Sequence, residues 1–212
     1  MITPDDPLSR SNQMNQDDGE ATPLHTMHPL SRFSNRAADY AQYRPSYPDA
    51  AIDAILENLG APSQLVAADM GAGTGISSRL LAERGVQVLA LEPNVAMRQA
   101  AQPHPLVVFR DGTAEKTALP NASIDLVTCF QSFHWFEPQS ALAEFRRILK
   151  RSRRLALVWN DRDQEDEFQQ SYNRLVRQVS SNHPAERRLI AVNPLFSSPH
   201  FANVQRFVLA YK

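Results

Sequence analysis

The chain has 212 residues with a formal net charge of −1, and 42% of its residues are hydrophobic. This length and composition are ordinary for one globular domain, and the near-neutral charge excludes a global attraction to nucleic acid or anionic membranes. A small-molecule partner is therefore expected. No apolar run reaches the ~18 residues of a membrane span. The N-terminus also lacks the basic-then-apolar order of a signal peptide. Both observations predict a cytoplasmic protein. A single cysteine, Cys129, excludes an internal disulfide.

Polar residues and prolines dominate residues 1–30, which hold too few large apolar groups to offset the entropy of ordering. We therefore expect a flexible tail over residues 1–30 and one folded domain over residues 31–212. After Pro48, apolar residues at helical spacing predict a first helix that ends at Gly60 and covers one face of a sheet.

Short apolar segments alternate with amphipathic segments from Leu65 onward, the pattern of parallel strands joined by crossover helices. The expected strands are Leu65–Asp69, Val86–Glu92, Leu106–Arg110, Ile124–Phe130 and Leu155–Asn160. The expected later helices and last strand are Ile76–Arg84, Asn94–Ala101, Gln139–Lys150, Phe168–Val179 and Val204–Tyr211. This order predicts an α/β fold with a Rossmann-like, doubly wound, mostly parallel sheet flanked by helices.

A glycine-rich turn follows the first predicted strand and opens the next helix. Its glycines, Gly71, Gly73 and Gly75, stand at alternate positions, with Ala72 between the first two. Glycine permits positive φ angles and lets the backbone approach a ligand without a Cβ clash. The turn therefore predicts a ligand site, against the alternative that it only makes a tight connection.

The residues around this turn help to choose the ligand. The dinucleotide fingerprint GxGxxG needs a sixth-place glycine, where this chain has Ile76. Asp69 would sit badly beside two phosphates, but it suits the ammonium group of a methionyl moiety, directly or through water. Glu92, at the end of the second strand, can accept both ribose hydroxyls of either cofactor. The spacing favours S-adenosylmethionine over a nicotinamide cofactor. A nicotinamide-dependent oxidoreductase remains the alternative.

Together, the strand, the Asp-x-Gly-x-Gly-x-Gly turn, the helix and the acid-terminated second strand resemble the class I methyltransferases. The resemblance implies that Thr113 and Ala114 contact adenine. The later run Gln131–Phe136 resembles the Gln-x-x-His-Trp-Phe signature of type 11 methyltransferases, which include trans-aconitate methyltransferase-like proteins. It implies that Gln131 approaches the methionyl end of the cofactor, and that His134 and Trp135 border the methyl group.

The same resemblance implies that residues 31–48 form a lid over the pocket. Tyr40 and Tyr43 would close the methyl channel, and Arg44 would bind a carboxylate. The alternative is an ordinary packing segment with a surface arginine. Excluding water would strengthen the electrostatic contacts inside the site.

Methyl transfer requires chiefly that nucleophile, methyl group and sulfur lie in line. For a carboxylate acceptor no base is needed, and Arg44 is the important partner. For a hydroxyl, an amine or an acidic carbon, His134 is the candidate general base. No Cys/His cluster has metal-ligand spacing, so no metal is expected.

Two features depart from the family pattern. The basic run Lys150–Arg154 replaces the usual Pro-Gly-Gly turn. Together with Arg146 and Arg147, we expect it to be solvated and to lie beside a helix C-terminus. The alternative is a patch that binds nucleic acid. The family also continues beyond the point reached by Lys212, which implies that the C-terminal edge strand is missing. A cofactor-binding protein without turnover is therefore the second functional hypothesis.

Overall fold

The structure is a computed structural model, and it describes residues 45–161, 166–179 and 192–209. The expected tail over residues 1–30 lies outside the described residues. So do the lid residues Tyr40, Tyr43 and Arg44.

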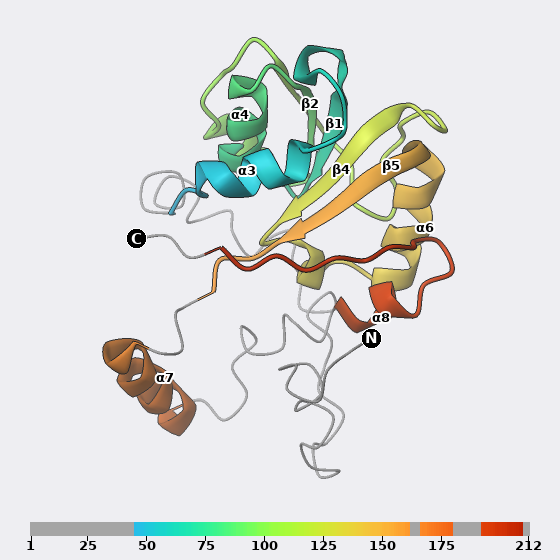
Figure 1. Ribbon diagram of the computed structural model, residues 1–212. Helices are drawn as coiled ribbons and strands as arrows, with labels where there is room; N and C mark the ends of the chain where they lie inside the picture. The colour runs from blue at the N-terminus through green and yellow to red at the C-terminus, as the bar shows by residue number, and fades with distance from the viewer. Residues whose placement is uncertain (1–44, 162–165, 180–191, 210–212) are drawn as a thin grey trace.

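A five-stranded parallel sheet forms the centre of the molecule (Figure 1). Its strands lie in the order β3-β2-β1-β4-β5, so the chain reverses its direction of winding between β1 and β4. This order confirms the predicted α/β class, and ligands of such sheets bind outside the carboxyl ends of the strands at this reversal. The strands are β1 Val66–Met70, β2 Gln87–Leu91, β3 Val107–Arg110, β4 Ile124–Phe130 and β5 Leu149–Val158.

Helices cover both faces of the sheet. The central strand β4 is therefore buried along its whole length, and its alternate side chains lie in two separate cores. Leu126 packs into the core that includes α3 and α4, whereas Val127 packs into the core that includes α6 and α8. The helices are α3 Asp49–Leu56, α4 Ile76–Glu83, α5 Val95–Gln99, α6 Pro138–Ile148, α7 Glu167–Val179 and α8 Asn193–Phe196. Two short 3-10 helices, η4 Pro62–Gln64 and η5 Phe133–Trp135, complete the described elements.

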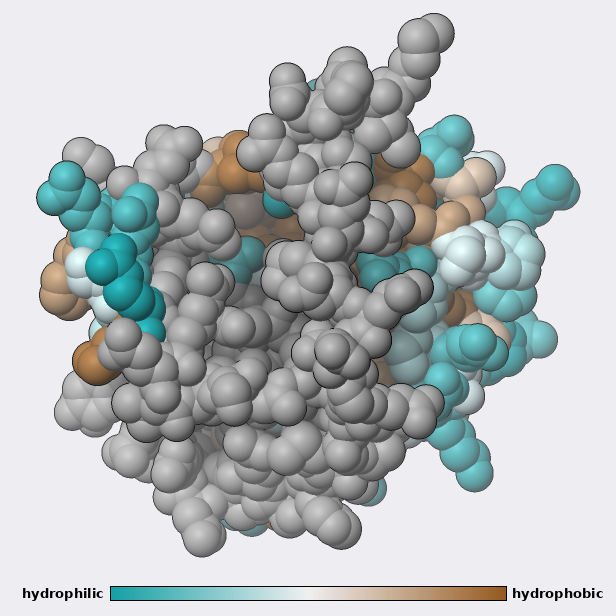
Figure 2. All heavy atoms as spheres, turned by 90° about the horizontal axis from the view of Figure 1, so that it is seen from below, coloured by the Kyte–Doolittle hydropathy of each residue, from teal (hydrophilic) through white to brown (hydrophobic). Residues whose placement is uncertain are grey.

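The helix α7 lies apart from the sheet (Figure 1). Phe168 and Leu175 on this helix are 73% and 58% exposed. On the face seen in Figure 2, hydrophobic and hydrophilic groups of the described residues lie side by side along the margins. None of the helices in the described ranges is long and apolar enough to cross a membrane.

The basic run forms part of a strand and not the turn that the sequence predicts. Strand β5 begins at Leu149, directly after α6, and therefore takes in the whole basic run. Lys150 Nζ and Arg153 Nε lie 2.8 and 3.1 Å from the carboxylate of Asp125, which is buried in β4. The prediction of a turn was wrong because this segment pairs with β4, but Arg151 and Arg153 are exposed, as the sequence predicts.

Arg154 also has a structural role. Its guanidinium donates hydrogen bonds to the carbonyls of Ala54 and Ile55, at 3.2 and 2.6 Å, near the C-terminus of α3. A cation is favourable at a helix C-terminus, where carbonyls lack partners. Arg146 and Arg147 lie in the last turn of α6, as the sequence predicts, whereas Arg154 interacts with the end of α3.

The predicted last strand is absent from the described part of the C-terminal segment. Residues 204–209 carry no strand, and Phe207 and Val208 are exposed. A strand needs a hydrogen-bonded neighbour as well as apolar residues, and none of the described strands pairs with this segment.

Candidate functional site

The glycine turn lies at the carboxyl end of β1, at the reversal point of the sheet. Gly71, Gly73 and Gly75 have φ angles of +65°, +58° and +78°, in the left-handed region that favours glycine. The backbone N–H groups of Gly71 and Ala72 both donate to the carbonyl of Leu91, at 2.9 and 3.1 Å. These bonds fasten the turn to the end of β2.

Neighbouring side chains leave no room for larger residues at two of these positions. A Cβ on Gly71 would lie 2.8 Å from the Cβ of Ser132, and a Cβ on Gly75 would lie 2.7 Å from the ring of Phe109. Both distances are shorter than a carbon contact allows. Gly71 and Gly75 are therefore required by the packing of the protein itself.

Asp69 is buried at the end of β1 and faces hydroxyl groups of the protein. Its Oδ2 accepts hydrogen bonds from Ser77 and Ser78, both at 2.7 Å, and its Oδ1 accepts one from Thr128 at 2.8 Å. Burial raises the pKa of Asp69, while the three hydroxyl donors oppose that shift. This carboxylate ties β1, α4 and β4 together beneath the turn, and the sequence did not reveal that role.

Glu92 follows β2 and touches the glycine turn directly. Its Oε2 accepts the backbone N–H of Gly73 at 2.8 Å, and its Oε1 accepts that of Asn94 at 2.8 Å. Burial raises the pKa of Glu92, and these two backbone donors oppose the shift. Arg98 donates to the Glu92 carbonyl and lies 3.5 Å from Asp111, which links this corner to the end of β3. Each carboxylate oxygen of Glu92 retains acceptor capacity for a further donor.

Thr74 carries a buried polar atom without a partner. Its Oγ1 is the one such side-chain atom found within the described residues. Its carbonyl, by contrast, accepts a hydrogen bond from Arg79 at 3.2 Å. A buried hydroxyl that makes no hydrogen bond is unfavourable, so this atom, inside a turn with glycine geometry, is a candidate ligand contact.

The segment after β4 meets the glycine turn from the other side. Ser132 donates to the carbonyl of Met70 at 2.6 Å, and it is the residue that limits space at Gly71. Gln131 has a φ of +54°, and its N–H donates to Val158 at 2.9 Å. A left-handed residue other than glycine is a strained conformation of a kind found at functional sites.

His134 and Trp135 lie on the following 3-10 helix η5 and are partly buried. Their rings are 5.1 Å apart at an angle of 43°. The Nε1 of Trp159, a residue that directly follows β5, lies 3.2 Å from the Nδ1 of His134. The structure thus brings His134 together with an aromatic residue that the sequence analysis did not select.

The predicted adenine segment lies beyond β3. Ala114 is buried, and Thr113 is partly buried and accepts the N–H of Lys116 at 3.2 Å. Glu115 accepts the backbone N–H of Glu137 at 2.9 Å, which joins this segment to the start of α6.

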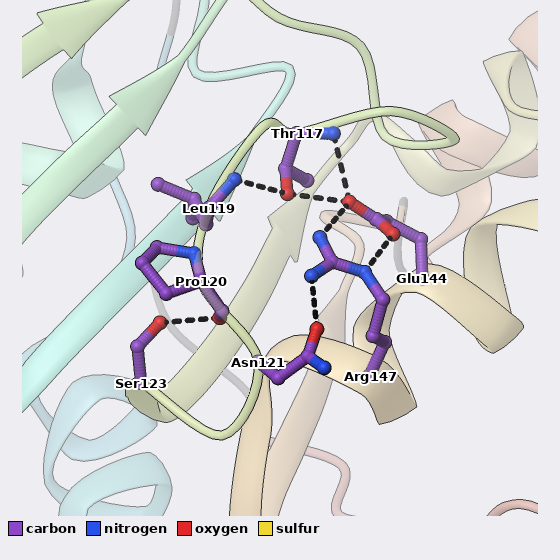
Figure 3. Close-up of polar contacts among 7 residues, drawn as sticks. All are labelled: Thr117, Leu119, Pro120, Asn121, Ser123, Glu144 and Arg147. Atoms are coloured by element: carbon purple, nitrogen blue, oxygen red, sulfur yellow. Dashed lines mark hydrogen bonds and ion pairs between the residues drawn. The ribbon is translucent and has the colours of Figure 1, made fainter.

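Hydrogen bonds from Thr117 to Glu144 also hold the chain that follows the adenine segment to α6 (Figure 3). Glu144 accepts the N–H and the hydroxyl of Thr117, at 2.9 and 2.6 Å, and forms two hydrogen bonds of 2.7 Å with Arg147. Arg147 also reaches Asn121 at 2.6 Å. These contacts lower the pKa of Glu144 to about 2, with the hydrogen bond from Arg147 as the largest cause.

Among the described residues, the structure brings the glycine turn, Glu92 and the Ser132 segment to one sheet edge. No cluster of potential metal ligands is found in the described part of the chain. The sequence analysis missed Thr74, Ser132 and Trp159. Thr74 lies inside the glycine motif and Ser132 inside the aromatic run, so their positions offered a signal, whereas the role of Trp159 depends on strand pairing.

Comparison with known proteins agrees with this geometry. A methyltransferase domain family matches residues 68–157. Uncharacterised methyltransferases of Mycobacterium tuberculosis and Mycobacterium bovis are 40% identical over 135 residues, which are 62% of this chain and 53% of those proteins. The chain therefore spans about half the length of the curated relatives that it matches.

Solved structures show the same fold. A protein of Anaeromyxobacter dehalogenans described as a putative type II methyltransferase has a TM-score of 0.56 and 34% identity, with 65% of this chain and 58% of that chain covered. Geranyl diphosphate C-methyltransferase of Streptomyces coelicolor, solved with S-adenosyl-L-homocysteine, has a TM-score of 0.53 and 17% identity, with 66% of each chain covered. Over the matched domain, the chain is similar to the class I methyltransferases. The narrower resemblance to trans-aconitate methyltransferase-like proteins stays a prediction.

Proposed function

We propose that this domain binds S-adenosylmethionine and transfers its methyl group to a small-molecule acceptor. The observation that carries the proposal is the contact between Glu92 and Gly73, which places a carboxylate against the glycine turn at the ligand edge of the sheet. A ribose hydroxyl can donate to the remaining acceptor positions of Glu92. This carboxylate already accepts the N–H of Gly73, an amide that a pyrophosphate at the start of α4 would otherwise use.

The residues present fit this cofactor. Gly71, Gly73 and Gly75 leave three positions of the turn without a side chain, and the unpaired Oγ1 of Thr74, between two of them, offers a hydrogen bond. Glu92 would hold the ribose, Thr113 and Ala114 would border adenine, and the turn with Ala72 and Gln131 would hold the methionyl end. The cofactor supplies a methyl group activated by positively charged sulfur. The solved neighbour that holds S-adenosyl-L-homocysteine supports the fold, whereas the cofactor assignment depends on the residues of this chain.

The protein would then act by binding, orienting and excluding water. We propose that Trp135, with Tyr40, Tyr43 and Arg44 of the lid, encloses the methyl group and the acceptor. Asp69 is proposed to act by bracing the turn, because its carboxylate is buried against three hydroxyl donors. A direct contact with the cofactor ammonium would have to compete with those bonds.

Calorimetric titration tests the cofactor. S-adenosyl-L-homocysteine is expected to bind and NAD to give no heat; the opposite result would overturn the proposal and favour an oxidoreductase. Screening small acids, phenols and amines for release of S-adenosyl-L-homocysteine then tests turnover. Binding without turnover on every acceptor would favour a cofactor-binding protein.

A further inference from the structure

The indole of Trp159 and the imidazole of His134 meet at the carboxyl edge of β4 and β5. Phe130 and Val158, the last residues of these two strands, are paired in register. Trp159 follows Val158 directly, and its Nε1 lies 3.2 Å from the Nδ1 of His134. The pairing of the strands therefore creates this contact between residues 25 positions apart.

The direction of this hydrogen bond determines where His134 carries its proton. An indole N–H can only donate, so the Nδ1 of His134 must accept with its lone pair. A neutral imidazole has one donor nitrogen and one acceptor nitrogen, and the proton therefore lies on Nε2. Protonating Nδ1 would place two N–H groups against each other and break the bond.

Surrounding contacts hold the two rings in this arrangement. Trp159 packs against the core that α6 and α8 cover, and the ring of Trp135 lies 5.1 Å from that of His134. Gln131 ties the flanking segments together, because its N–H donates to Val158 at 2.9 Å and its side chain donates to Asn160 at 3.3 Å.

We propose that Trp159 is a positioning residue that holds His134 as an Nε2–H hydrogen-bond donor, so that His134 does not serve as a general base. This inference rests on the proposed methyl transfer. A general base takes a proton with a ring lone pair, and the one such lone pair of neutral His134, on Nδ1, accepts the indole N–H of Trp159. The sequence left two kinds of methyl acceptor open: one that needs His134 as a general base, and a carboxylate, which needs no base. The geometry supports the acceptor that needs no base.

An acceptor group that reaches the site already ionised, such as a carboxylate, fits this donor. A carboxylate oxygen would form a bond to the methyl carbon with one lone pair, while Nε2–H binds the carboxyl group. The carbon–sulfur bond breaks and its electron pair stays on sulfur, which becomes neutral. No proton changes place, so no base is required.

Nitrogen-15 NMR of the imidazole groups tests the proposal. His134, assigned by its loss in His134→Gln, is expected to show the Nε2–H tautomer in the wild-type protein at a pH where the ring is neutral. Trp159→Phe removes the donor and should give a mixture of the two tautomers. Trp135→Phe is the matched control, because it removes a neighbouring indole while the Trp159 donor stays, and it should keep the wild-type tautomer.

An Nδ1–H tautomer in the wild-type protein, or an unchanged tautomer in Trp159→Phe, would overturn the proposal. Titration of the same samples with S-adenosyl-L-homocysteine reports separately on the proposed function and on folding of the variants. With S-adenosylmethionine and a panel of small carboxylic acids, phenols and amines, turnover of carboxylates is expected. Turnover confined to phenols or amines would contradict the donor role, whereas failure to bind S-adenosyl-L-homocysteine would contradict the proposed function and not the tautomer.

Discussion

The backbone N–H of Gly73 donates a hydrogen bond of 2.8 Å to the Oε2 of Glu92. The two residues come from different β-α connections, so this bond joins the glycine turn to the end of β2. The second carboxylate oxygen accepts the N–H of Asn94 at 2.8 Å. One side chain thereby fixes two backbone segments on which the proposed cofactor would lie.

The change Glu92→Gln should weaken binding of S-adenosyl-L-homocysteine by about tenfold or more, or about 1.4 kcal/mol. An amide has one carbonyl oxygen, so its NH₂ group would face a backbone N–H at one of the two sites. Calorimetric titration measures the effect. Glu57→Gln, at an exposed acid near the end of α3, is the control and should bind as the wild type does. Equal affinity in both variants would contradict the placement of the ribose.

Asp69 should respond differently to two substitutions. Asp69→Ala leaves three buried hydroxyls without their acceptor and should lower the free energy of unfolding by about 3 kcal/mol. Asp69→Asn keeps one acceptor oxygen, and its NH₂ group can donate to a hydroxyl, so it should fold with a smaller loss. Urea denaturation measures both.

The affinity of Asp69→Asn for S-adenosyl-L-homocysteine separates bracing from direct contact. If Asp69 acts beneath the turn, the dissociation constant should rise by less than about tenfold. A loss of about a hundredfold in a variant with near wild-type stability would show that the carboxylate itself meets the ammonium group.

Strand β4 was predictable to the residue, whereas β5 was not, and the difference is physical. All seven side chains of β4 are buried, so its apolar run has definite ends. The start of β5 contains Lys150, Arg153 and Arg154, which local rules assign to a solvated turn. Their partners, Asp125 and carbonyls of α3, belong to other elements and are brought close only by the fold.

In the candidate site, too, local features were predictable from the sequence and tertiary contacts were not. The positions of the glycines follow from local backbone demands, which a sequence displays directly. The inward orientation of Asp69 and the meeting of His134 with Trp159 depend on strand pairing and on which helix covers the turn. A pattern of residue types therefore predicted the ligand edge, but not the direction in which each side chain there points.

Gly71→Ala should destabilise the domain more than a glycine substitution at an open turn. The new Cβ would meet Ser132 at 2.8 Å, and alanine would also have to adopt a φ of +65°. We expect a loss of about 2 to 4 kcal/mol in the free energy of unfolding. Gly60→Ala is the control, since φ is +102° there but no atom lies within 4 Å of the added Cβ. Equal losses would show that the Ser132 contact relaxes at no cost.

Asp125→Ala should lower the free energy of unfolding by about 1 to 3 kcal/mol. The change removes the acceptor of the Val66 N–H and the partner of both Lys150 and Arg153, next to the start of β1. Asp53→Ala, which removes an exposed acid paired with Arg84, should cost about 1 kcal/mol or less. An effect of Asp125→Ala no larger than that of Asp53→Ala in urea denaturation would mean that water replaces Asp125 as the partner of Lys150 and Arg153.

The pair formed by Glu144 and Arg147 should make stability depend on acid pH. The pKa of Glu144 falls from 4.5 to about 2 on folding, so its contribution is fully present above pH 4.5 and is lost as pH falls toward 2. Its side chain is 11% exposed, and allowing for solvent screening we expect about 1 to 3 kcal/mol at pH 7.

Urea denaturation of Glu144→Gln and wild type between pH 7 and pH 3 measures this contribution. The difference in unfolding free energy should be largest at pH 7 and should shrink as the pH falls below 4.5. Glu83→Gln, at an exposed acid that ends α4, should show little difference at any pH. A Glu144→Gln difference that stays constant down to pH 3 would mean that the loss reflects packing, because an interaction of the ionised carboxylate with Arg147 must weaken as Glu144 becomes protonated.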